Sequence, residues 1–301
     1  LNIESVPGLF SRMVKQTPLQ VCPFTELIGF GDGDDERLVD LAKRELMKNS
    51  SLSIVVGLAP HSPYTTTAKA LNALACYADQ EEIPITVHVS ESEDEFEMFT
   101  SGSGALFNKM KGLGREISDC SAKSPIQHFN HSGGAALRTL VVHANYLINE
   151  DFDFLVKPGL SVVHCPKSHS WFGYADFEYN RLAKKGVNIC IGTDSLASSG
   201  NPQQTHEELN MFDEMRQFKS KNPDVDIDDI LEMATYNGAK AIGLERRLGR
   251  LEEGMLANFA IIPFSKHMSE VKESIISHKG SVSGLFISGK HIYSGKNSIA
   301  D

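Results

Sequence analysis

Residues Leu52–Val89 read LSIVVGLAPHSPYTTTAKALNALACYADQEEIPITVHV and give the clearest indication of the fold. Both ends, Leu52–Ala59 and Ile83–Val89, are short, apolar and rich in β-branched residues, which is typical of strands buried on both faces of a parallel sheet. Between them, Thr67–Ala78 has the spacing of apolar residues that favours a helix. A strand, a helix and a second strand in this order predict a βαβ unit.

The same alternation recurs over the first two thirds of the chain. Further strands are predicted at Leu19–Ile28, Leu140–Ala144, Leu160–Cys165 and Val187–Thr193, and helices at Glu36–Lys48, at Ala135–Thr139 with its upstream loop, at Glu150–Val156 and at Phe177–Lys185. These make six strands, and the opening LNIES is a candidate for the end of a seventh. Since a closed barrel of this kind has eight strands, we predict an α/β fold, a (β/α)₈ barrel whose first strand lies upstream of Leu1.

The last third of the chain has a different pattern. Helices are predicted at Glu207–Lys219 and Ile227–Gly238, with Thr235–Leu244 continuing the second. From Gly249 onward the chain reads as short strands and turns, which need partners to bury one face. We therefore predict two domains, an incomplete (β/α)₈ barrel over residues 1–244 and a portion of a small β-rich domain over residues 245–301.

Charge and cysteine content argue against several classes of protein. A formal net charge of −10 disfavours binding to nucleic acid or to an anionic membrane, which requires a basic face. The five cysteines form no CxxC pair, which fits a reducing compartment, and no apolar run is long enough to span a bilayer. With no signal peptide in the sequence, we expect a cytoplasmic protein with a small-molecule substrate and leave self-association open.

Polar residues follow almost every predicted strand, where a (β/α)₈ barrel carries its catalytic groups. The residues at these strand ends are His61, His88, His143, His164 and Asp194. Because the carboxyl ends of parallel strands meet at one rim, we expect one polar cluster there.

His88 and Glu91 lie in the segment HVSE. A neutral imidazole is a good ligand for zinc, and a carboxylate shortly after it can reach a water bound to the metal. A divalent metal lowers the pKa of that water to about 7, and the carboxylate can then carry a proton to the leaving group. The alternative is a histidine packed in the core and a solvated glutamate.

Asp194 and His143 complete the predicted catalytic set. Asp194 follows an apolar strand, and a buried carboxylate is costly unless it is paired or bound to a metal, so it is a candidate ligand or base. His143 can hydrogen-bond the water or the oxygen on which charge develops. The alternatives are an aspartate that caps a turn and a core histidine.

The other histidines receive weaker assignments. His61, which opens a loop rich in prolines and hydroxyls, is predicted to contact substrate, as are His169, Trp171 and Ser195. His164 is assigned either to the support of the site or to the core. The remaining histidines are predicted at the surface: His128, His131, His206, His267, His278 and His291.

Taken as a set, these motifs resemble the amidohydrolase superfamily. They are APHSPYT (59–65), HVSE (88–91), VVHANYL (141–147), HCPKSH (164–169) and GTDSLAS (192–198). Their order and spacing are similar to those of the branch that holds cytosine and guanine deaminases, S-adenosylhomocysteine and aminodeoxyfutalosine deaminases and triazine chlorohydrolases. The late GRLEEGMLANFAII resembles the return of that family into its β-sandwich.

The resemblance implies one divalent metal ion, zinc first and iron as the alternative. In that branch an HxH pair on the first strand, a histidine on the fifth and an aspartate on the eighth hold the metal. Carried over, His88 and Asp194 are ligands, Glu91 is the general acid and base, His143 orients the attacking water, and His61 lies beside the substrate. This sequence contains no HxH, so the pair is expected upstream of Leu1, and the metal can be absent from this chain.

Two further features of the sequence refine these expectations. Relatives with two metals bridge them with a modified lysine on the fourth strand, whereas this chain has GLAPHSP there, which favours a single metal. Many relatives also have asparagine in place of His169, so the usual substrate contacts need not apply.

The leading hypothesis is therefore hydrolytic deamination of an amino-substituted nitrogen heterocycle, of the nucleobase or nucleoside type. The same site could instead release chloride from a triazine, or open a cyclic amide or imidazolone. A third hypothesis is an inactive barrel remnant that only binds a ligand or partner.

Overall fold

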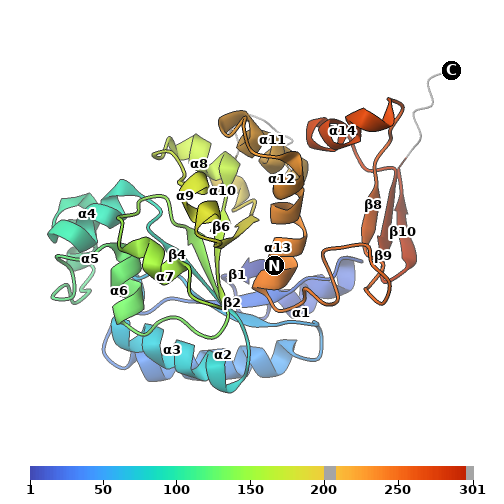
Figure 1. The fold of residues 1–301 in the computed structure, drawn as a ribbon. Helices are drawn as coiled ribbons and strands as arrows, with labels where there is room; N and C mark the ends of the chain where they lie inside the picture. Colours follow the sequence, from blue (N-terminus) through green and yellow to red (C-terminus); the bar gives the residue numbers. More distant parts are fainter. Residues whose placement is uncertain (200–207, 296–301) are drawn as a thin grey trace. The chain divides into compact units, whose positions relative to one another are not determined.

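The computed structural model describes residues 1–199 and 208–295, and the chain divides into two compact units. The first unit comprises residues 1–164 and 174–189. The second comprises residues 165–173 and 190–301. Figure 1 shows the order of the elements along the chain.

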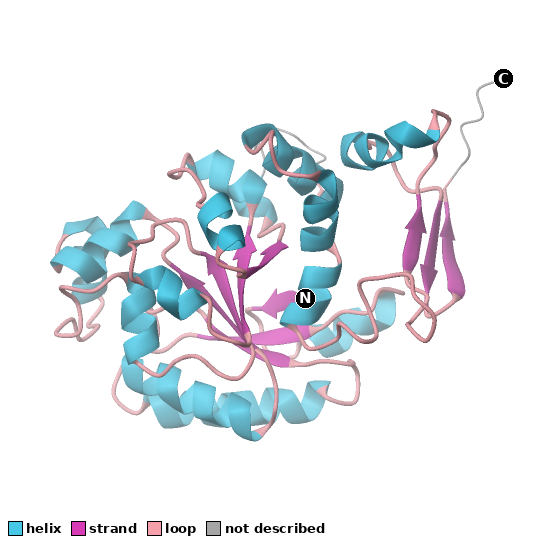
Figure 2. Cartoon of the chain, in the orientation of Figure 1, coloured by secondary structure: helices cyan, strands magenta, loops and turns pink. Residues whose placement is uncertain are grey.

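A seven-stranded sheet runs through the chain in sequence order (Figure 2). Its neighbouring strands from the first to the sixth are parallel. The strands are β1 (Asn2–Glu4), β2 (Pro23–Leu27), β3 (Gly57–Pro60), β4 (Ile85–Val89), β5 (Thr139–His143), β6 (Leu160–His164) and β7 (Asn188–Ile191). The predicted α/β class with βαβ connections is confirmed, although β2 and β3 begin later than Leu19 and Leu52.

Helices connect these strands in the first unit. They are α1 (Leu9–Met13), α2 (Asp34–Asn49), α3 (Ala68–Gln80), α4 (Glu93–Ser101), α5 (Gly104–Gly112), α6 (Pro125–His131), α7 (Asp151–Leu155) and α9 (Tyr179–Lys184). The helix predicted at Ala135–Thr139 is wrong, since Thr139 already begins β5 and the helix lies upstream, at α6. A capping box formed by Ser124 and Gln127, with Pro125 in the first turn, sets the start of α6.

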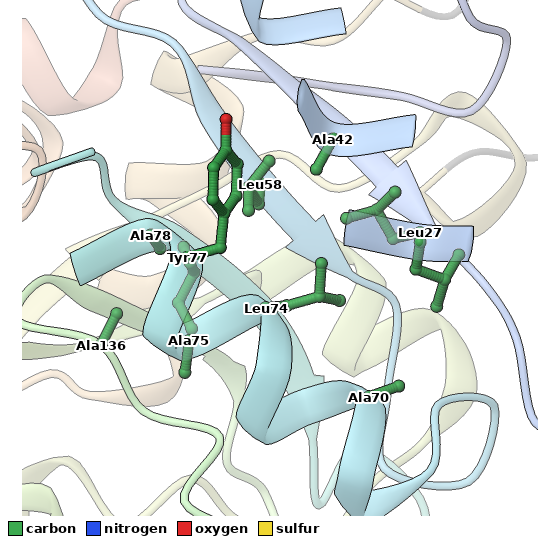
Figure 3. Packing of buried hydrophobic residues seen from close by; sticks show 11 residues of the cluster. Leu27, Ala42, Leu58, Ala70, Leu74, Ala75, Tyr77, Ala78 and Ala136 are labelled. Atoms are coloured by element: carbon green, nitrogen blue, oxygen red, sulfur yellow. The ribbon is translucent and has the colours of Figure 1, made fainter. Parts of the chain in front are cut away.

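The core of the first unit shows why α2 and α3 form where they do. Helix α3 begins at the N-cap Thr67, whose side chain accepts a hydrogen bond from the Ala70 N–H, and it buries one apolar face. Figure 3 shows Leu74 of α3 and Ala42 of α2 with Leu27 and Leu58 of the strands in one cluster. This packing supports the sheet beneath the strand ends.

The second unit contains a run of helices and a small antiparallel sheet. Its elements are α8 (Pro166–Phe172), α10 (Leu196–Ser199), α11 (Met211–Lys221), α12 (Ile227–Ala234), α13 (Tyr236–Ala241), α14 (Val271–Ser277), β8 (Phe259–Ile261), β9 (Gly284–Ile287) and β10 (Lys290–Ser294). The sheet has the order β10-β9-β8. It agrees with the predicted β-rich end of the chain, while the domain boundary at residues 244 and 245 stays a prediction.

Two expectations for the second unit need correction, and one of its helices was not predicted. Helix α11 begins at Met211, whereas the predicted start at Glu207 lies outside the described residues. Thr235 separates α12 from α13 with φ −132° and ψ −85°, so the helix predicted through Gly238 is broken. No helix was predicted at α8, where Pro166 stands in the first turn and its missing N–H has no cost.

Within residues 1–199 and 208–295, the structure contains no helix with the length and apolar character needed to cross a membrane.

Candidate active site

Four of the predicted site residues lie together in the first unit. His61 directly follows β3, His88 is in β4, Glu91 comes two residues after β4, and His143 ends β5. The ring centroids of His61 and His88 are 5.2 Å apart, and those of His88 and His143 are 5.6 Å apart. His143 Nε2 lies 3.6 Å from Glu91 Oε1. The strand ends therefore bring these four side chains into one cluster, while their individual roles stay predictions.

His88 is oriented as a metal ligand requires. Its Nδ1 lies 2.8 Å from the main-chain carbonyl oxygen of His61, and a carbonyl oxygen only accepts hydrogen bonds. Nδ1 must therefore carry the proton, which leaves the lone pair on Nε2. Histidines that bind metals commonly donate their other ring N–H to a carbonyl in this way. The tautomer of His88 therefore fits that of a histidine bound to a divalent metal ion through Nε2.

His61 is held by the loop that it opens. Its Nδ1 lies 2.7 Å from Thr65 Oγ1 and 3.1 Å from Ser62 Oγ. Burial, and then the neighbouring His88, lower the pKa of His61, so its ring is neutral at neutral pH. The ring of Tyr64 meets it edge-on at 5.8 Å.

The two loops that follow β4 and β5 adopt unusual backbone conformations and hold each other. Ser90, His143 and Ala144 have φ values of 58°, 75° and 50°, in the left-handed region that non-glycine residues seldom adopt. The Ala144 N–H donates to Val89 O at 3.1 Å, and the Ser90 hydroxyl donates to Tyr146 O. Such conformations persist only where the surroundings enforce them, and they concentrate at functional sites.

Glu91 has partners that sequence reasoning did not identify. The Tyr174 hydroxyl donates to Glu91 Oε1 at 3.3 Å. Asn145 Nδ2 donates to the Glu91 main-chain carbonyl at 2.9 Å, and Glu95 Oε2 accepts from the Glu91 N–H at 2.8 Å. Only Glu95 had a recognisable signal, since Ser92-x-x-Glu95 has the spacing of a capping box.

Glu95 is a fully buried carboxyl group, 1% exposed. Burial raises its pKa to about 8. The effect of burial is larger than that of the main-chain hydrogen bonds from Ser90 and Glu91, which lower the pKa. Glu95 is therefore largely a neutral acid at neutral pH.

This burial predicts a dependence of stability on pH. An unfolded glutamate ionises near 4.5, whereas the folded one keeps its proton to about 8, so the folded state loses stability as pH rises between those values. Glu95→Gln removes the titration. Between pH 5 and pH 8, the unfolding free energy of the wild type should fall by about 2–4 kcal/mol relative to Glu95→Gln. Urea unfolding of both proteins at the two pH values measures this; a constant difference would contradict it.

In the second unit, Asp194 stands just beyond β7 with a left-handed φ of 54°. The Ser168 hydroxyl donates to its Oδ2 at 2.7 Å, and the Ser195 N–H donates to its Oδ1 at 2.8 Å. Nearby on the same unit, Glu214 accepts from the Lys167 N–H at 2.8 Å, and burial raises the pKa of Glu214 to about 7. Hydrogen bonds from α8 and from the next residue thus hold the Asp194 carboxylate.

The predicted substrate contacts of the second unit are on α8 and beside Asp194. His169 and Trp171 belong to α8, where Trp171 is 48% exposed, and Ser195 is exposed with its hydroxyl 2.9 Å from Ser198 Oγ. The convergence of Asp194, Ser195, His169 and Trp171 with the histidines of the first unit stays a prediction.

The prediction that His128 lies at the surface is wrong. It is 5% exposed, and its ring lies 4.5 Å from that of Phe99. Burial lowers the pKa of His128 to about 4, and Arg115 nearby makes a salt bridge to Asp119 at 2.8 Å. The aromatic ring beside His128 comes from α4, a helix that the sequence did not indicate.

The other histidines are placed as follows. The prediction that His278 lies at the surface is also wrong, since it is half-buried and its ring lies 5.0 Å from that of Phe212. His164 is buried, and its ring stacks on Phe177 at 3.9 Å. His131, His267 and His291 are exposed as expected, and His206 lies outside the described residues.

Comparison with known proteins identifies relatives of the chain. The sequence profile described as "Amidohydrolase family" matches residues 14–292. The chain is 29% identical over 258 residues to the 5-methylthioadenosine/S-adenosylhomocysteine deaminase of Thermococcus sibiricus, covering 83% of this chain and 56% of that protein. It therefore spans little more than half the length of this curated relative.

Two solved structures are similar in fold. The aminofutalosine deaminase of Helicobacter pylori in complex with methylthio-coformycin matches with a TM-score of 0.81 and 21% identity, covering 97% of this chain and 71% of that one. The atrazine chlorohydrolase of Arthrobacter aurescens complexed with zinc matches with a TM-score of 0.72 and 16% identity, covering 94% and 63%. These two structures confirm the predicted barrel-type α/β fold class, and the profile match over residues 14–292 confirms the predicted family resemblance.

Proposed function

Because the chain belongs to the amidohydrolase family, we propose that it catalyses the metal-dependent hydrolytic deamination of an amino-substituted nitrogen heterocycle. The substrate class that we propose is an adenine nucleoside or a related nucleobase, as the name of the Thermococcus relative suggests. The observation that carries the proposal is the approach of Glu91 to His143 beside a His88 whose Nε2 is available.

We assign His88 Nε2 and the Asp194 carboxylate to a single divalent metal ion, zinc first. The HxH pair usual in the family would complete the ligand set, since the two ligands of this chain are fewer than the three protein ligands that catalytic zinc sites generally have. Such an ion lowers the pKa of water and polarises the bond under attack. The hydrogen bonds to Asp194 from Ser168 and Ser195 would orient its oxygens toward the ion.

The residues of the chain would then move the protons. Glu91 takes a proton from the attacking water through Oε1 and delivers it to the leaving amine, so that water adds its oxygen to the ring carbon, the C–N bond breaks and ammonia leaves. His143 Nε2, 3.6 Å from Glu91 Oε1, holds the water in line. His61 contacts the substrate, and His169, Trp171 and Ser195 are the proposed contacts from the second unit.

The proposal is tested by ammonia release from a panel containing 5-methylthioadenosine, S-adenosylhomocysteine, adenosine and guanine. Metal content is measured on the same preparation. We expect ammonia from at least one adenine nucleoside and one zinc ion per chain. Chloride from a chlorotriazine without ammonia would favour the chlorohydrolase alternative, and ring-opened products would favour amide or imidazolone hydrolysis. No product and no metal would favour a protein that only binds a ligand.

We also propose a cytoplasmic location, because the five cysteines are free and four of them are buried.

A further inference from the structure

We propose that Glu95 and Asn145 are positioning residues that clamp the main chain of Glu91 from both sides and so fix its carboxylate for proton transfer. This inference rests on the catalytic role proposed for Glu91. Neither residue is among the groups that we assign to the metal or the substrate.

Glu95 holds the N–H side of Glu91. Helix α4 begins at Glu93, and its N-cap Ser92 accepts the Glu95 N–H at 3.2 Å. In a capping box the third residue returns its side chain to the cap residue. Here Glu95 Oε2 instead accepts the N–H of Glu91, the residue before the cap residue Ser92, at 2.8 Å. The start of α4 therefore carries an acceptor aimed at the residue expected to move the proton.

Asn145 holds the carbonyl side of Glu91. Its Nδ2 donates to Glu91 O at 2.9 Å, and its own N–H donates to Ser90 O at 2.9 Å. Asn145 is only 3% exposed, and it follows the left-handed residues His143 and Ala144. The loop that follows His143 is therefore also hydrogen-bonded to the loop that carries Glu91.

The clamp accounts for the position of the Glu91 carboxylate. With its N–H and C=O both bonded, the main chain of Glu91 cannot rotate without breaking one of the two bonds. The side chain of Glu91 therefore starts from a fixed Cα, and the Tyr174 hydroxyl donates to its Oε1 at 3.3 Å, which lies 3.6 Å from His143 Nε2. A misplacement of about 1 Å at a reacting group can cost about 10²-fold in rate.

The charge of Glu95 suits this role. As a buried neutral acid it accepts the Glu91 N–H without placing a second negative charge beside the Glu91 carboxylate. The titratable groups that interact with Glu95 are Glu91, from its own loop, and Tyr64, from the loop after β3. Glutamine reproduces both the acceptor and the neutrality, whereas leucine is neutral but offers no acceptor.

The test compares kcat, KM and amide hydrogen exchange at Glu91 in Glu95→Leu, Glu95→Gln and Asn145→Asp. Glu95→Leu and Asn145→Asp should lower kcat about 10- to 100-fold with KM within about threefold, and should speed exchange of the Glu91 amide. Glu95→Gln should stay within about threefold of the wild-type kcat.

Two controls, the buried Glu45 and the exposed Asn72, separate positioning from stability. Glu45 is buried and accepts the Gly8 N–H at 3.2 Å, and Asn72 Nδ2 donates to Gly133 O at 3.4 Å, both elsewhere in the first unit. Glu45→Leu and Asn72→Asp should leave kcat unchanged. The clamp is overturned if the kcat of Glu95→Gln falls as far as that of Glu95→Leu, or if Glu45→Leu loses as much kcat. It is also overturned if amide exchange at Glu91 is the same in Glu95→Leu and Asn145→Asp as in the wild type. A wild type without product on any substrate would reject the proposed function, while exchange would still test the clamp.

Discussion

Replacing Glu91 with glutamine is expected to lower kcat by about 10²–10⁴-fold, the range typical of a lost general acid and base. Glutamine keeps the shape of the side chain, and it can still receive the hydrogen bond from Tyr174. It cannot take a proton from water or pass one to the leaving amine. The loss should therefore fall on kcat, with KM and metal content close to those of the wild type.

The matched control for this variant is Glu93→Gln. Glu93 begins α4 two residues further along the same segment and is exposed, so neutralising it should change kcat less than about twofold. If Glu91→Gln keeps the wild-type kcat, Glu91 is not the general acid and base. An equal loss in both variants would point to the net charge of the segment instead.

Removing the metal ion is expected to lower activity by at least about 10³-fold, equivalent to about 4 kcal/mol of transition-state stabilisation. Dialysis against a chelator should abolish ammonia release, and added zinc should restore it. His88→Ala should retain less zinc at equal total concentration, because it deletes a proposed ligand, as elemental analysis would show.

His131→Ala is the control for His88→Ala. His131 is exposed at the end of α6, and its Nδ1 lies near the Gln127 carbonyl, so its removal should leave zinc content unchanged. Full activity after chelation, with no metal left in the protein, would contradict the assignment of a metal-dependent hydrolase.

The parallel strands and the polar residues at their ends could be predicted because both depend on local patterns. A strand such as TLVVH has consecutive apolar residues, which is typical of burial on both faces of a parallel sheet, and its carboxyl end lies at the same edge as those of its neighbours. His61, His88, Glu91 and His143 therefore lie together in the first unit as their positions along the chain imply.

The helices proved harder to place than the strands. The start of α6 depends on a reciprocal pair of side-chain hydrogen bonds between Ser124 and Gln127, and this signal is as short as many that form loops. The break at Thr235 lies inside a run of good helix formers, which periodicity alone reads as continuous.

From its own patterns, the chain specified its α/β class, its family and the residues expected to perform chemistry, since periodicity and strand-end position act over a few residues. The partners of Glu91 arose from folding, because Asn145 is 54 residues away along the chain and Tyr174 is 83. The buried state of Glu95 and His128 likewise comes from segments packed around them, and it moves their pKa values in opposite directions. Burial penalises whichever form is charged, and no stretch of sequence reveals how much water a folded chain will exclude.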